Sequence, residues 1–205
     1  LILGGETLSP PARMIYDHLG PRLENDLNAG NPSSRLLVRS AGFPHMAPSS
    51  YYAWLDYLTR DNCPPIVILG VEPDLGGLWP DDWHLPDKQT MAGTYLQWQA
   101  DDQTVHVKIL EGMQPGTTPS TPEQTGDSIS YLKACLQKCA DLVVERGGTP
   151  ILLLEPRSQH APDNQASLTH ENFLQLADAL NMKGVIGSAE KPEDSDEAGF
   201  DAHLV

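Results

Sequence analysis

Apolar and polar residues alternate along this chain with two periodicities, which mark out strands and helices. Short, continuous apolar runs at residues 1–3, 66–69 and 151–154 each end at glycine or polar residues, as buried parallel strands do. Elsewhere apolar residues recur every three or four positions, which predicts amphipathic helices. The predicted strands are 1–3, 35–39, 66–69, 150–154 and 185–186, and the predicted helices are 12–27, 49–59, 128–146 and 169–181.

This alternation of strands and helices predicts the fold class. It indicates an α/β protein with three layers, α/β/α, in which helices flank a central five-stranded parallel sheet in a flavodoxin-like arrangement. The length suits one domain over residues 1–205. The chain starts inside the first predicted strand, and no helix follows the last one. We therefore expect a segment of a longer protein.

The regular alternation is interrupted between residues 76 and 126. Residues 94–99 and 104–110 alternate in polarity around a polar turn, which predicts an inserted β-hairpin. Residues 115–125 have the Thr, Pro, Gln and Glu content of a loop. We expect this insertion to lie near the edge of the sheet that holds the active site.

Charge narrows the choice of partners. The chain has 28 acidic and 13 basic residues, a formal charge of −15, which argues against nucleic acid and anionic lipid. No apolar run is long enough to cross a bilayer, so we expect no direct membrane insertion of this segment. We expect no cofactor, and Asp81, Asp82 and His84 lack the spacing of a known metal site.

The three cysteines provide no disulfide framework. Cys135 and Cys139 are four residues apart on the apolar stripe of a predicted helix, so we interpret them as core residues rather than metal ligands. Cys63 precedes two prolines and gives no signal of its own.

Polar groups follow the first three predicted strands. Glu6 and Thr7 come after the first strand, Gly42 after the second, and Glu72 after the third. Carboxyl ends of parallel strands share one edge of a sheet, where ligands bind and where amides at helix starts attract developing negative charge. Thr7 is therefore a candidate nucleophile, although a helix cap is the alternative reading of this residue.

The order of these groups resembles the SGNH, or GDSL-type, hydrolase superfamily over essentially the whole chain. The sequence Gly-Glu-Thr-Leu at residues 5–8 is similar to the family's first block, which reads Gly-Asp-Ser. Residues 39–44, Arg-Ser-Ala-Gly-Phe-Pro, are similar to its Asn-Ala-Gly-x-Pro turn, and residues 200–204 to its late block with Asp and His. The resemblance implies ester hydrolysis or O-acyl transfer.

The resemblance also assigns roles to residues. Thr7 would attack an ester carbonyl, His203 would act as general base, and Asp201 would orient the imidazole. Gly42 would help to hold the oxyanion, and Glu6 and His45 would lie beside the pocket.

Two departures from the family pattern concern its chemistry. Glu72 stands where the family has an oxyanion-binding asparagine, and an ionised carboxylate would repel the oxyanion unless burial kept it protonated. Thr7 replaces serine, and its extra methyl group stiffens χ1 and crowds the attack.

Two functions remain open. We favour a diverged SGNH-hydrolase-like domain with weak or lost esterase activity, which binds a glycan or another subunit within a larger extracytoplasmic protein. The alternative is an active ester hydrolase or O-acyltransferase on acylated carbohydrate. The aromatic residues of the insertion suit a sugar ring, a protein interface through this insertion, or packing against the chain's own domain. They are Trp79, Trp83, Tyr95 and Trp98.

Overall fold

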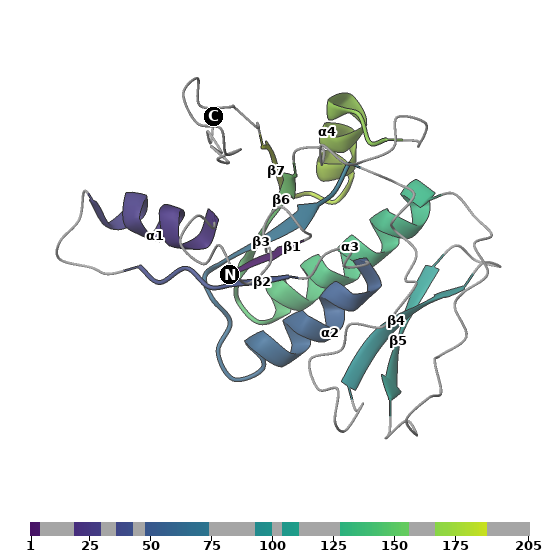
Figure 1. Cartoon of the computed structure of the whole chain (residues 1–205). Coiled ribbons are helices and arrows are strands. Elements are labelled where there is room, and N and C mark those ends of the chain that lie inside the picture. Colours follow the sequence, from purple (N-terminus) through teal and green to yellow (C-terminus); the bar gives the residue numbers. More distant parts are fainter. Residues whose placement is uncertain are drawn as a thin grey trace.

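The computed structural model describes residues 1–4, 19–29, 36–42, 48–73, 93–99, 104–110, 128–155 and 167–187. Its central feature is a five-stranded sheet with the order β2-β1-β3-β6-β7, in which all neighbouring strands are parallel (Figure 1). The strands are β1 (Ile2–Gly4), β2 (Ser40–Gly42), β3 (Ile66–Val71), β6 (Thr149–Leu154) and β7 (Lys183–Ile186). This sheet confirms the predicted α/β class and the predicted number of central strands.

Helices cover both faces of the sheet. The helices are α1 (Leu19–Ala29), α2 (Pro48–Thr59), α3 (Ser128–Glu145) and α4 (His170–Ala179). Ile2 and Leu153 form one apolar cluster with Leu23 of α1, whereas Leu3 and Leu152 belong to a larger cluster with residues of α2, α3 and α4. Since successive side chains of a strand point to opposite faces, α1 lies on one face and the other three helices on the opposite face. Right-handed crossovers give this distribution for the observed strand order.

The inserted hairpin packs on the helices rather than on the sheet. Strands β4 (Gly93–Gln99) and β5 (Thr104–Leu110) form an antiparallel pair, which confirms the predicted hairpin. Leu96, Trp98 and Val105 are buried and belong to the same apolar cluster as α2 and α3. The hairpin therefore adds a layer on the outer side of these two helices (Figure 1).

The second strand differs from its prediction. It begins at Ser40, whereas the apolar pattern predicted a strand over residues 35–39. Side chains of α1 hold the backbone before it: Leu36 N donates to Asn28 Oδ1 at 2.8 Å, and Val38 N donates to Glu24 Oε2 at 2.9 Å. Because α1 satisfies these amides, the segment does not need a neighbouring strand. The helix predicted over residues 12–27 corresponds to α1, and residues 11–18 lie outside the described part.

Two glycines end α3 and lead into β6. Gly147 has a φ of +83°, a conformation that suits glycine, and its N donates to Val144 O at 2.9 Å. Gly148 N donates to Val143 O at 2.9 Å, which completes a Schellman motif. A Cβ atom on Gly148 would lie 2.9 Å from Pro64 O, so this turn packs closely on the segment before β3.

Cys135 and Cys139 lie in the core, as predicted, with no exposed surface. Burial raises the pKa of both thiols above the ordinary value of 9.0. Because the folded state keeps them protonated, their contribution to stability is complete below about pH 9 and is lost as the pH rises further.

We expect these two thiols to resist Ellman's reagent at pH 8 until the chain unfolds in urea. The Cys63→Ser variant isolates them, because it removes the third, partly buried thiol. Fast reaction of two thiols in this folded variant would contradict their burial.

Candidate functional site

The carboxyl ends of three neighbouring strands meet at one edge of the sheet, called here the carboxyl edge. Gly4 of β1 is the register partner of Gly42 of β2, and Leu3 is the partner of Leu69 in β3. The next residue along β3, Gly70, therefore lies beside Gly4. The structure thus brings together the strand ends from which the sequence predicted a site.

Glu72 follows β3 directly at this edge. Two backbone hydrogen bonds hold the chain around it: Glu155 N donates to Val71 O at 2.8 Å, and Leu168 N donates to Pro73 O at 2.7 Å. The Glu72 side chain is partly exposed. Its backbone is therefore fixed at the edge, and its carboxylate is within reach of solvent.

Glu155 is a residue of this edge that the sequence analysis did not identify. It follows β6, and the register pairs Val71 with Leu154, so Glu155 and Glu72 are the next neighbours beyond the paired strands. Glu155 is 1% exposed and is the only charged side chain that is fully buried in the described ranges. A polar residue directly after an apolar run is the same signal that marked the other strand ends, and it would have identified Glu155.

A buried tyrosine lies at the end of β3. Tyr51, in the first turn of α2, donates a hydrogen bond from its Oη to Gly70 O at 2.7 Å. Burial raises the pKa of Tyr51 well above 10.0, and the negative charges of Glu155 and then Glu72 raise it further. The Tyr51 phenol therefore stays neutral at physiological pH, and its hydroxyl is fixed on the backbone of β3.

Other predicted site residues are placed in part or not at all. Gly42 ends β2, and the Tyr95 backbone belongs to β4. The predicted site residues that lie outside the described ranges are Glu6, Thr7, His45, Trp79, Trp83, Asp201 and His203. The arrangement of Thr7, His203 and Asp201 accordingly stays a prediction.

Trp98 is a packing residue of the hairpin. Its side chain is 5% exposed, and its ring meets that of Tyr131 in α3 edge to face, with 5.7 Å between the ring centroids. Three roles were considered for the aromatic residues: sugar binding, a protein interface and packing. Trp98 packs the hairpin against its own domain.

Neither a metal cluster nor a membrane-spanning helix is found within the described ranges. These ranges hold no group of three or more His, Cys, Asp or Glu residues that could bind a metal ion. None of the helices described in them is long and apolar enough to cross a bilayer.

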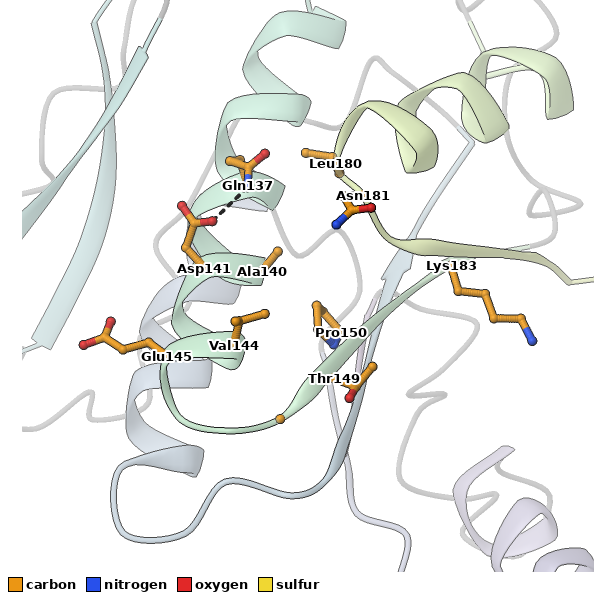
Figure 2. A pocket seen from close by; sticks show the side chains of 11 residues that line it. Gln137, Ala140, Asp141, Val144, Glu145, Thr149, Pro150, Leu180, Asn181 and Lys183 are labelled. Atoms are coloured by element: carbon orange, nitrogen blue, oxygen red, sulfur yellow. Dashed lines mark hydrogen bonds between the residues drawn. The ribbon is translucent and has the colours of Figure 1, made fainter.

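An open groove of about 630 Å³ lies at the opposite edge of the sheet (Figure 2). Its wall includes Thr149 and Lys183, the first residues of β6 and β7, and the α3 side chains Gln137 and Asp141, which hydrogen-bond each other at 2.8 Å. Because parallel strands start at this edge, the groove is separated from Glu72 by the length of the sheet. It is not part of the candidate site.

Comparison with known proteins finds a likeness to a solved structure but none to a known sequence. No family model and no curated protein match this sequence. The chain is similar to the crystal structure of the psychrotrophic esterase EstA from Pseudoalteromonas sp., inhibited by monoethylphosphonate, with a TM-score of 0.48 and 12% sequence identity. The match covers 90% of this chain and 75% of that chain. At this score and identity the likeness says nothing about activity, and the fold rests on the sheet order described above.

Proposed function

We propose that this chain is a diverged SGNH-hydrolase-like domain whose ester-hydrolysing activity is weak or lost. In this proposal it serves as a binding module, for a glycan or another subunit, within a larger extracytoplasmic protein. The supporting observation is the position of Glu72 at the carboxyl edge, beside the end of β1, from which Thr7 follows three residues later.

The chemistry of acyl transfer explains why Glu72 matters. An ester under attack develops negative charge on its carbonyl oxygen, and hydrogen-bond donors must hold that oxyanion. The loss of one such donor costs about 3 to 4 kcal/mol of transition-state stabilisation. A carboxylate at this position removes the donor and also repels the oxyanion. Ester hydrolysis at the carboxyl edge would therefore be slow, although the strand ends could otherwise hold a catalytic site.

The described part of the hairpin supports a protein partner better than a glycan. Trp98 is buried, whereas Val107 and Ile109 of β5 are 41% and 72% exposed. These two side chains lie on one face of the strand, and contiguous exposed apolar surface is typical of contacts between subunits. Retention of the protein on an acetylated polysaccharide column would instead assign the binding role to a glycan.

Hydrolysis of p-nitrophenyl acetate distinguishes this proposal from the alternative, an active esterase or O-acyltransferase that uses Thr7, His203 and Asp201. We expect the wild-type protein and its Thr7→Ala variant to hydrolyse this ester at the same low rate. A wild-type rate that Thr7→Ala abolishes would establish the alternative.

A further inference from the structure

The two faces of the central sheet differ in how well they are covered. On the face that α2, α3 and α4 cover, the strand side chains are buried, and they are Leu3, Val67, Leu69, Leu152 and Leu154. Side chains on the opposite face, called here the α1 face, alternate with these along each strand. On the α1 face Ile66 is 51% exposed, and Ile68, Ile151 and Val185 are partly exposed. The described residues therefore cover this face incompletely over β3, β6 and β7, called here the open strands.

Helix α1 covers the β1 and β2 side of the α1 face. A Cβ atom on Gly20 would lie 3.2 Å from Ser40 Oγ, and Glu24 accepts the hydrogen bond from Val38 N. Parallel sheets are normally covered on both faces, and three neighbouring strands span about 10 Å, which is the width of one helix. The stretches that follow β6 and β7, residues 156–166 and 188–205, lack the apolar periodicity of an amphipathic helix. The open strands thus have room for one helix that these stretches do not encode.

A second exposed apolar patch lies at the end of α1. Leu27, Leu36 and Leu37, called here the leucine patch, are between 46% and 67% exposed. Asn28 joins the two parts of this patch, because its Oδ1 accepts from Leu36 N and its Nδ2 donates to Leu36 O, both at 2.8 Å. The second part of the patch leads into the start of β2, and Ile66 is the first residue of β3. The leucine patch and the most exposed residue of the open strands therefore both lie toward the edge at which the strands begin.

We propose that the α1 face is the interface of a homodimer, in which the leucine patch of each copy covers the open strands of the other. A twofold axis parallel to the strands exchanges the two sides of this face, so it brings α1 of one copy over Ile66 and Ile151 of the other. Each contact then occurs twice. The occupant is a second copy because both halves of the contact lie on the same face of one chain.

Charge on the two halves of the contact is complementary. Asp26 is exposed on α1, next to the first residue of the leucine patch. Lys183 is exposed at the start of β7, in register with Ile151, and its side chain points away from α3 (Figure 2). The twofold axis places the acidic side of one copy against the basic side of the other, which favours this orientation of the two chains.

Sedimentation velocity of the purified protein tests the homodimer, which we expect to form at about 100 μM. Ile66→Lys and Leu37→Lys should each weaken association at least about tenfold, since each buries an unpaired charge at both copies of an apolar contact. Both side chains are more than half exposed in the single chain, so the variants should fold, which circular dichroism checks. Val144→Lys is the matched control, because Val144 is an exposed apolar residue of α3 on the opposite side of the sheet, and it should leave association unchanged.

A mixture of the Ile66→Lys and Leu37→Lys proteins tests the pairing of the two patches. One of the two contacts in a mixed dimer is unaltered, so the mixture should recover dimers that neither variant forms alone. Failure to recover them would overturn the pairing.

Two other results would overturn the inference. A wild-type protein that stays monomeric would leave the α1 face to a different chain. A dimer that is weakened by Ile109→Lys or Val144→Lys as much as by Ile66→Lys would place the interface elsewhere. The inference goes beyond the proposed function, which concerns the carboxyl edge and the hairpin, and ester hydrolysis tests that proposal separately.

Discussion

Exchange of Glu72 for asparagine is expected to raise Thr7-dependent hydrolysis of p-nitrophenyl acetate by at least about 100-fold, since one oxyanion donor contributes about 100- to 1,000-fold in other hydrolases. The backbone hydrogen bonds at Val71 and Pro73 fix this position at the edge, so a shorter amide would occupy the place of the carboxylate without a change in the sheet. The asparagine amide would donate a hydrogen bond to the oxyanion, whereas the glutamate carboxylate would repel it. The rate is measured as kcat/KM at pH 7 for purified variants.

The matched controls for this exchange test charge and mechanism separately. Glu72→Gln removes the charge but keeps the longer side chain, and we expect it to give a smaller gain than asparagine. Thr7→Ala in the Glu72→Asn background should return the rate to that of the wild type. A gain that survives Thr7→Ala would show that another group performs the reaction.

Replacement of Arg146 by methionine is expected to lower the free energy of unfolding by about 3 kcal/mol. Arg146, just beyond α3, donates from Nη1 to Asp56 O at 3.0 Å and to Thr59 Oγ1 at 2.7 Å, and from Nη2 to Asp56 Oδ1. It thereby satisfies carbonyl groups in the last turn of α2, where a positive charge is also favourable. Methionine preserves the apolar contact of the side chain and removes all of these bonds.

Arg60 provides the matched control, because it pairs with the same carboxylate. Its Nη2 lies 2.9 Å from Asp56 Oδ2, but its side chain is 63% exposed, whereas that of Arg146 is 22% exposed. Arg60→Met should therefore cost less than about 0.5 kcal/mol. Urea unfolding monitored by circular dichroism measures both values. Equal costs for the two variants would show that the helix-end contacts of Arg146 contribute nothing.

The central sheet could be predicted because its signals are local. Apolar runs such as residues 66–69 and 151–154 are continuous, helical patterns separate them, and right-handed crossovers limit the possible strand orders. The hairpin was equally clear from its alternating polarity. The start of β2 could not be predicted from the sequence, because it depends on Glu24 and Asn28. Their side chains reach from α1 to the backbone of a later segment. Such a contact leaves no trace in the periodicity of the segment itself.

The candidate site was predicted in part for a similar reason. The ends of β1, β2 and β3 were identified by their glycines and polar residues, and the sheet order brings them together. Glu155 carries the same local signal, a polar residue directly after an apolar run, but its burial could not be predicted, because it depends on β3 and β7 on either side of it. The packing role of Trp98 likewise depends on Tyr131 in a distant helix.

The central claim is that the Glu72 carboxylate at the end of β3 prevents ester hydrolysis at the carboxyl edge. The most direct test is the ratio of the p-nitrophenyl acetate hydrolysis rates of the wild-type protein and Thr7→Ala. We expect a ratio close to one, with both rates near that of buffer. A wild-type rate at least tenfold above that of Thr7→Ala would contradict it, because Glu72 would then be compatible with a stabilised oxyanion.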